Sequence, residues 1–186
     1  LSTQDRSLAM DTLLKLNQRY AGRISATAGP LADAAAWKKM EQARRQGLPR
    51  QSGRGYLTGC SGVFSSMAVR ADGVMVPCIQ LSHIELGRIN QDALGAVWRQ
   101  HPELRRLRER RRIPLSSFAF CSDCPYVNYC TGNCPALAYT LTGEVNTPSP
   151  DACLRRFLDE GGEFFLHDGG RLEHAGAGSR LENVPE

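Results

Sequence analysis

Residues 121–134 read CSDCPYVNYCTGNC, and they contain four of the seven cysteines in this chain of 186 residues. The four cysteines are separated by two, five and three residues. A gap of two residues lets both thiolates turn onto one metal centre, which explains why such pairs recur in zinc and iron–sulfur sites. The spacing therefore indicates a metal site, with zinc and iron–sulfur both open.

The odd number of cysteines also favours a metal site over disulfides. A framework of disulfides would leave one of the seven thiols over. The first residues, LSTQDR, lack the charged and then apolar pattern of a secretory signal peptide. We therefore expect reduced cysteines and a cytoplasmic location.

A second pair of cysteines brackets a predicted β-hairpin. The motif reads Cys60-x12-Gly73-x4-Cys78. Asp72 and Gly73 lie between two short apolar runs, MAVR and VMV, and glycine accepts the positive φ of a tight turn. Because this turn folds the chain back, we expect Cys60 and Cys78 to approach each other.

The region before the cysteines, residues 1–47, is expected to form a helix, a strand and a helix. Apolar residues recur at helical spacing over residues 9–20 and again over 32–46. Between them, residues 23–28 predict a short strand, which a Gly-Pro pair ends. One strand and one helix cannot make a sheet alone, so we expect a larger α/β domain upstream of Leu1. A small helical hairpin is the alternative.

The other boundaries follow from composition. Residues 48–59 are a linker rich in Gly, Arg and Ser, and a cysteine-rich region over 60–162 follows. Within it, short helices are predicted over 94–100 and 135–142. Residues 163–186 become rich in glycine and charge, which predicts a flexible carboxy-terminal tail. The expected fold class is therefore α+β.

The charge and hydropathy of the chain exclude two classes of partner. A net charge of +4 and a pI near 8.8 are only mildly basic, so we expect no nucleic-acid partner. No run approaches eighteen consecutive apolar residues, so we expect no membrane span. A basic run of six arginines is interpreted as a solvated helix face; its members are Arg105, Arg106, Arg108, Arg110, Arg111 and Arg112.

The complete cysteine arrangement resembles the SPASM domain, the carboxy-terminal extension of many radical S-adenosylmethionine (SAM) enzymes that modify peptides. All seven cysteines take part, because Cys153 follows Cys134 after eighteen residues. The stretches CTGNCP and PSPDAC are similar to those of SPASM proteins, and they also resemble the SynChlorMet cassette subgroup. Residues 1–47 look like the terminal βα piece of the partial (β/α) barrel of such enzymes.

The resemblance implies two auxiliary 4Fe-4S clusters with interleaved ligands. The distal cluster would be bound by Cys121, Cys124, Cys130 and Cys153. The proximal cluster would take three ligands, Cys60, Cys78 and Cys134. Relatives with a full proximal site often have a further cysteine shortly before the one that matches Cys60, whereas residues 52–59 contain none. The fourth position is therefore open, or filled by water, another side chain or substrate.

The chain lacks the Cys-x3-Cys-x2-Cys triad that holds the SAM-cleaving cluster in these enzymes. Only Cys130 and Cys134 have the first spacing, and Leu137 stands at the third position. We therefore expect no SAM cleavage by this chain alone and assign it no catalytic or SAM-binding residue. The resemblance implies that SAM binds an upstream barrel, that a peptide is the substrate, and that a reductant such as flavodoxin or ferredoxin supplies electrons.

Three alternatives stay open. A single zinc ion could be bound by the four cysteines of residues 121–134, although three cysteines would then be unexplained. The chain could also be a stand-alone electron-transfer module that serves a separate radical SAM subunit. His83, five residues after Cys78, could complete the proximal cluster, and Glu85 and Asp72 are poorer candidates.

Overall fold

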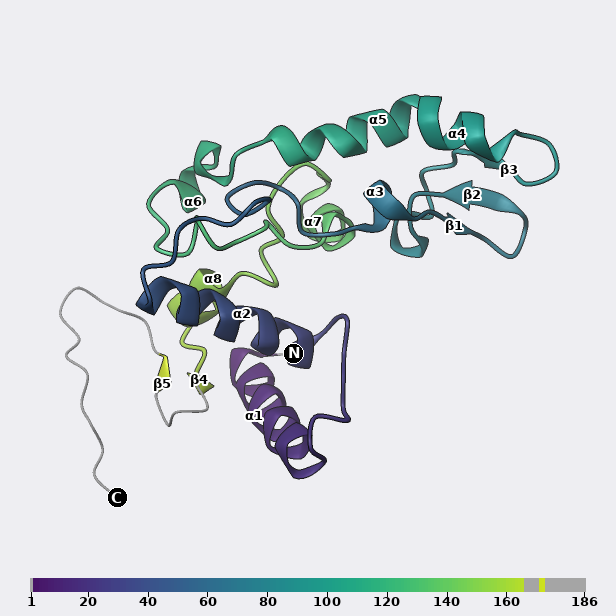
Figure 1. The fold of residues 1–186 in the computed structure, drawn as a ribbon. Coiled ribbons are helices and arrows are strands. Elements are labelled where there is room, and N and C mark those ends of the chain that lie inside the picture. Colours follow the sequence, from purple (N-terminus) through teal and green to yellow (C-terminus); the bar gives the residue numbers. More distant parts are fainter. Residues whose placement is uncertain (1, 166–170, 173–186) are drawn as a thin grey trace, which may run out of the picture. The chain divides into compact units, whose positions relative to one another are not determined.

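The computed structural model describes residues 2–165 and 171–172, and the chain divides into two compact units (Figure 1). The first unit comprises Leu1–Lys39 and Leu154–Glu186, and the second comprises Met40–Cys153. The helices and the small antiparallel sheets confirm the expected α+β class.

Helix α1, Thr3–Arg19, begins the first unit. Its amino-terminal end is fixed by a capping box, in which the backbone N–H of Asp5 donates to the Ser2 hydroxyl and the Asp5 carboxylate accepts from the Ser2 backbone. The helix ends at Tyr20, after which Ala21 and Gly22 both adopt positive φ. The predicted first helix is therefore confirmed.

The core of the first unit is aromatic. Trp37 comes from helix α2, Pro30–Arg45, and Phe157 from helix α8, Leu154–Asp159. The ring of Trp37 lies 4.9 Å from that of Phe157 and meets the ring of Phe164 edge-on at 5.9 Å. All three side chains are buried, and such pairs contribute beyond the area that they bury.

One expectation for this unit needs correction. Residues 23–28 form no strand, because no neighbouring strand of the described chain is available to satisfy their backbone groups; the barrel piece is therefore not shown. Within the segment predicted as a tail, strand β4, Phe164–Phe165, pairs antiparallel with strand β5, Arg171–Leu172. The rest of that prediction falls on residues 166–170 and 173–186, which lie outside the described residues.

The predicted hairpin is present in the second unit. Strand β1, Ala68–Val69, pairs antiparallel with strand β2, Val74–Val76, and Gly73 in the turn has a φ of 84°. Strand β3, Gly87–Arg88, which was not foreseen, pairs with the other edge of β2. The sheet therefore has three strands in the order β1-β2-β3.

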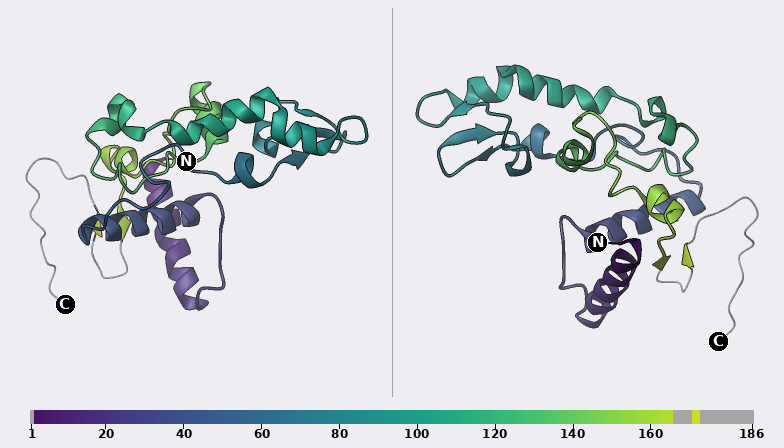
Figure 2. Two further views of the ribbon diagram at one scale, coloured as in Figure 1. Left: turned by 45° about the horizontal axis from the view of Figure 1, so that its top comes forward. Right: turned by 180° about the vertical axis from the view of Figure 1, so that it is seen from behind.

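Short helices surround the loops of this unit. Both predicted helices occur with the expected bounds, as α4, Leu94–Gln100, and α7, Pro135–Thr142. Proline at the first position of α7 costs no hydrogen bond, since that N–H has no helical partner. Figure 2 shows the strands beside α4 and α5, Pro102–Glu109. The smaller elements are α3 (Gly62–Ser65), η1 (Ile79–Leu81), η2 (Arg110–Arg112), η3 (Leu115–Ser117) and α6 (Ala119–Ser122).

Two small apolar clusters form the core of the second unit. One joins the sheet to α4 and α5 through Met75, Leu86, Val97 and Leu104. The other contains Val63, Leu81, Leu107, Ala136 and Val145, with Cys78 and Cys134 packed against it. Two of the predicted metal ligands therefore lie at the edge of the same apolar cluster.

Candidate metal centre

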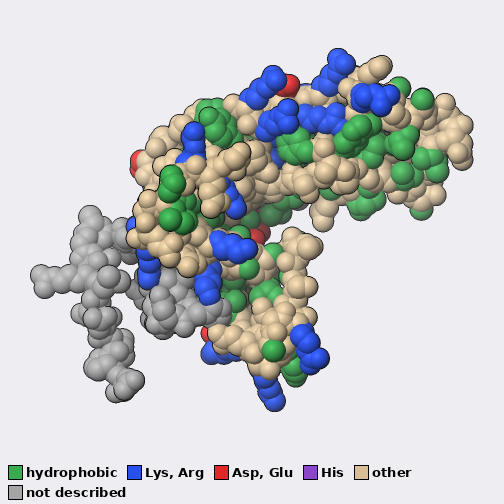
Figure 3. Space-filling model, viewed as in Figure 1, with side chains coloured by type: hydrophobic (Ala, Val, Ile, Leu, Met, Phe, Trp, Pro, Cys, Tyr) green, Lys and Arg blue, Asp and Glu red, His purple; other side chains and the backbone are tan. Residues whose placement is uncertain are grey.

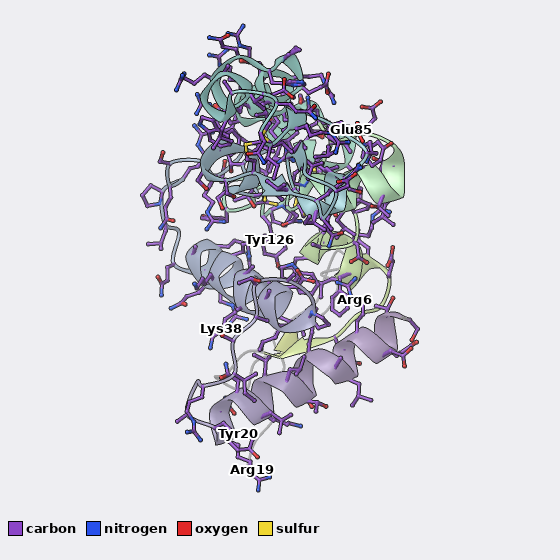
Figure 4. All side chains as sticks on the ribbon, turned by 90° about the vertical axis from the view of Figure 1, so that its right-hand side faces the viewer. Arg6, Arg19, Tyr20, Lys38, Glu85 and Tyr126 are labelled. Atoms are coloured by element: carbon purple, nitrogen blue, oxygen red, sulfur yellow. The ribbon has the colours of Figure 1, made fainter. Side chains whose placement is uncertain are left out.

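All seven cysteines are outside disulfides, are partly buried, and belong to the second unit. Sulfur atoms, yellow in Figure 4, lie among the loops and short helices of this region. The seven residues therefore remain available as thiolate ligands, which is what a thiolate-bound metal requires.

Two loops far apart in the sequence run side by side and carry three of the cysteines. The backbone N–H of Gly55 donates to the carbonyl oxygen of Cys130 at 2.8 Å. The N–H of Thr58 donates to the carbonyl oxygen of Thr131 at 2.9 Å. These bonds hold the chain just before Cys60 against the segment that joins Cys130 to Cys134.

Gly59 explains why these loops come so close. A Cβ atom at Gly59 would lie 2.3 Å from the carbonyl oxygen of Asn133 and 2.5 Å from its Cα and nitrogen atoms. Only glycine permits such an approach of two backbones. Because Gly59 precedes Cys60 and Asn133 precedes Cys134, the contact places these two cysteines on adjoining backbone.

A third segment brings in the last cysteine. The backbone N–H of Ser149 donates to the carbonyl oxygen of Gly132 at 3.0 Å, and the side-chain amide of Asn133 donates to the carbonyl oxygen of Ala152 at 2.8 Å. Gly132 and Asn133 both adopt positive φ, which aims their backbone groups at this segment. The segment that leads to Cys153 is therefore hydrogen-bonded to the loop between Cys130 and Cys134.

Tight turns arrange the remaining cysteines. The N–H of Cys124 donates to the carbonyl oxygen of Cys121 at 3.2 Å, and the N–H of Cys130 donates to that of Tyr126 at 3.0 Å. Burial raises the pKa of the Cys130 thiol, backbone N–H donors oppose this shift, and a Cys124 thiolate would add to it. The two turns therefore hold Cys121, Cys124 and Cys130 within one short folded segment.

Three thiols accept a backbone N–H from the second residue after them. The donors to Cys60, Cys78 and Cys130 are Gly62 at 3.3 Å, Gln80 at 3.2 Å and Gly132 at 3.3 Å. Hydrogen bonds of this kind to the ligand sulfurs tune the potential of an iron–sulfur cluster. The local geometry therefore suits anionic sulfur ligands.

Arg110 was missed as a candidate by the sequence analysis, which treated the arginine run as a solvated face. Its side chain is 0% exposed, although four neighbouring arginines of the run are exposed. Figure 3 shows Lys and Arg side chains along the surface of α5. The sequence contained a sign of this burial. Arg110 follows the buried Leu104 and Leu107 at intervals of three residues, which places it on the apolar face of the helix.

The three residues considered as a fourth ligand of the proximal cluster make contacts with other side chains. His83 is exposed and stacks on Tyr139, with 4.3 Å between the ring centroids. Asp72 and Glu85 both pair with Arg70. The Arg70 guanidinium lowers the pKa of the Asp72 carboxyl to about 2.

No three or more His, Cys, Asp and Glu side chains in residues 2–165 and 171–172 are grouped so that they could hold one metal ion. A 4Fe-4S cluster takes four cysteine thiolates, each on its own iron atom, so its ligands need not converge on a single point. The set of cysteine donors and the backbone N–H groups that point at their sulfurs fit such a cluster.

Comparison with known families agrees with this chemistry. Residues 60–125 match the model of the SPASM family, which is described as an iron–sulfur cluster-binding domain. No curated protein and no solved structure matches the chain. Of the helices in the described part, none has the length and apolar character needed to cross a membrane.

Proposed function

We propose that this chain binds two auxiliary 4Fe-4S clusters and acts with a radical SAM domain in the modification of a peptide. The observation that carries the proposal is the SPASM match at residues 60–125, together with three further cysteines fastened to the same loops. When bound, such clusters supply sites that accept and donate single electrons. The protein's own part is to hold them at fixed positions and to set their potential.

The proposed ligand sets are those that the resemblance implies. For the proximal cluster, Cys60 and Cys134 lie on adjoining backbone, and Cys78 and Cys134 pack against one apolar cluster. For the distal cluster, tight turns hold Cys121, Cys124 and Cys130 in one folded segment, and the segment before Cys153 is hydrogen-bonded to Gly132 and Asn133. These contacts support two groups of ligands that interleave in the sequence.

The partner domain follows from the sequence. A Cys-x3-Cys-x2-Cys triad is absent from the 186 residues, so SAM cleavage is proposed to belong to a barrel domain. A peptide substrate and a reductant of the flavodoxin or ferredoxin class are proposed on the same grounds. The second candidate function is a stand-alone electron-transfer module for a separate radical SAM subunit, which the seven-cysteine pattern suits equally.

Anaerobic reconstitution tests the proposal. We expect about eight iron and eight sulfide per chain, as two four-iron clusters require. Cys130→Ala and Cys134→Ala are matched variants, since each removes one thiolate from the same loop, yet they should damage different clusters. Stoichiometric zinc without iron–sulfur absorbance would refute the cofactor, and loss of the same cluster in both variants would refute the ligand sets.

A further inference from the structure

Arg110 carries a buried positive charge that no residue of the described chain pairs with. Its side chain is 0% exposed, and none of its three guanidinium nitrogens has a hydrogen-bond partner among the described residues. Burying a cation without a partner is costly, and buried polar groups in native proteins are almost always satisfied. Arg110 therefore calls for an acceptor that the described residues do not supply.

The other buried charged residue of this unit, Glu41, is fully paired. The Glu41 side chain is also 0% exposed, but Arg44 and Arg45 donate to its two carboxylate oxygens at 2.8 Å. Burial would raise the pKa of Glu41, and these bonds outweigh that effect and lower it. The contrast shows that the unpaired state of Arg110 is a local feature and not a general property of this unit.

The neighbours of Arg110 identify the missing acceptor. Leu107, three residues before Arg110, belongs to the apolar cluster against which Cys134 packs. Three residues after Arg110, the carbonyl oxygen of Ile113 accepts the N–H of Leu57 at 3.1 Å, which holds this segment beside the chain that leads to Cys60. The direction of the pKa effects agrees with this placement, since burial lowers the pKa of the guanidinium and thiolates at Cys60 and Cys134 oppose that shift. These two cysteines are proposed ligands of the proximal cluster. A cluster bound by thiolates is an anion whose sulfur atoms accept hydrogen bonds, which matches five N–H donors on a fixed cation.

The neighbouring arginines of the run make contacts within the protein. Arg108, two residues earlier, donates to the carbonyl oxygens of Val63 and Trp98 and lies 4.2 Å from the Trp98 ring centroid. Arg112, two residues later, is exposed and pairs with Glu109 at 2.7 Å. Arg110 alone in this run is both fully buried and without a partner among the described residues.

We propose that the Arg110 guanidinium faces the proximal cluster, donates N–H hydrogen bonds to its sulfur atoms and balances its negative charge. Arg110 is then a positioning residue that raises the reduction potential of that cluster, because a nearby cation and N–H donors both favour the more negative, reduced form. This inference rests on the proposed function, and it adds a role for a side chain that is not a cysteine.

The test is a redox titration of the reconstituted full chain, followed by paramagnetic resonance. Arg110→Met removes the charge and donors at similar length, and Arg110→Lys keeps the charge while removing the fork of donors. Arg112→Gln is the matched control, since it removes one exposed positive charge two residues away. Cys60→Ala and Cys121→Ala identify the signals of the proximal and distal clusters.

We expect Arg110→Met to shift the proximal midpoint potential to a more negative value and Arg110→Lys to shift it less. The distal potential should stay unchanged in both, and Arg112→Gln should move neither. If Arg110→Met does not retain its clusters, Arg110→Lys carries the same comparison. Loaded clusters with an unshifted proximal potential would overturn the role of Arg110, whereas failure to bind iron in the unaltered chain would overturn the proposed function instead.

Discussion

The two units of the chain differ in what completes their interiors. In the unit formed by Leu1–Lys39 and Leu154–Glu186, the largest buried side chains are aromatic rings that contact one another. In Met40–Cys153, two small apolar clusters accompany seven cysteines outside disulfides and Arg110, which has no partner among the described residues. The cation of the first interior, Arg6, lies over the Trp37 and Phe157 rings and pairs with Asp33, whereas the second has thiol ligands and a cation that a bound anionic cluster would satisfy.

Removing the iron should have the largest effect, and it should affect one unit only. Metal-binding free energy is folding free energy in small metal-dependent domains, so loss of the clusters should release the loops of residues 121–134. We expect hydrogen exchange of these amides to become fast after anaerobic chelation, while the amides of α1 stay protected. Equal loss of protection in α1 would show that the two interiors do not differ as argued.

Trp37→Ala tests the other interior. The ring is buried and contacts Phe157 and Phe164, so its removal should lower the free energy of unfolding by about 3–5 kcal/mol. Urea denaturation followed by circular dichroism measures this, with the exposed Leu8→Ala in α1 as control at about 0.5 kcal/mol or less. Iron content below the transition should match that of the unaltered chain, and a loss of iron would contradict the separation of the two interiors.

Gly59→Ala should have a smaller effect on stability but a specific effect on the metal. The added Cβ would collide with the backbone of Asn133, at a cost of about 1–3 kcal/mol. Because this contact adjoins Cys60 and Cys134, we expect less iron per chain after reconstitution.

Gly143→Ala is the control for that change. Gly143 ends α7 with a φ of 78°, and a Cβ there meets nothing within 4 Å, so the strain is about 1–2 kcal/mol without a collision. Its iron content should stay normal. Equal iron loss in both variants would mean that general destabilisation, and not the approach of the two cysteine loops, controls cluster binding.

Local signals in the sequence were sufficient for the elements that depend on a few adjacent residues. The turn at Asp72 and Gly73 predicted the hairpin, and the bounds of α4 and α7 were correct. The spacing of the cysteines identified the SPASM family. These features depend on backbone conformation and side-chain chemistry within short stretches, which the sequence states directly.

Features that depend on distant segments required the tertiary structure. Residues 23–28 have the composition of a strand but lack a partner in the described chain, whereas β3 forms because β2 offers it an edge. The close approach of Gly59 to Asn133, seventy-four positions away, leaves no local signal. Arg110, at the start of η2, is buried although four other arginines of its run are exposed, because exposure is set by what packs over a side chain and not by its own charge.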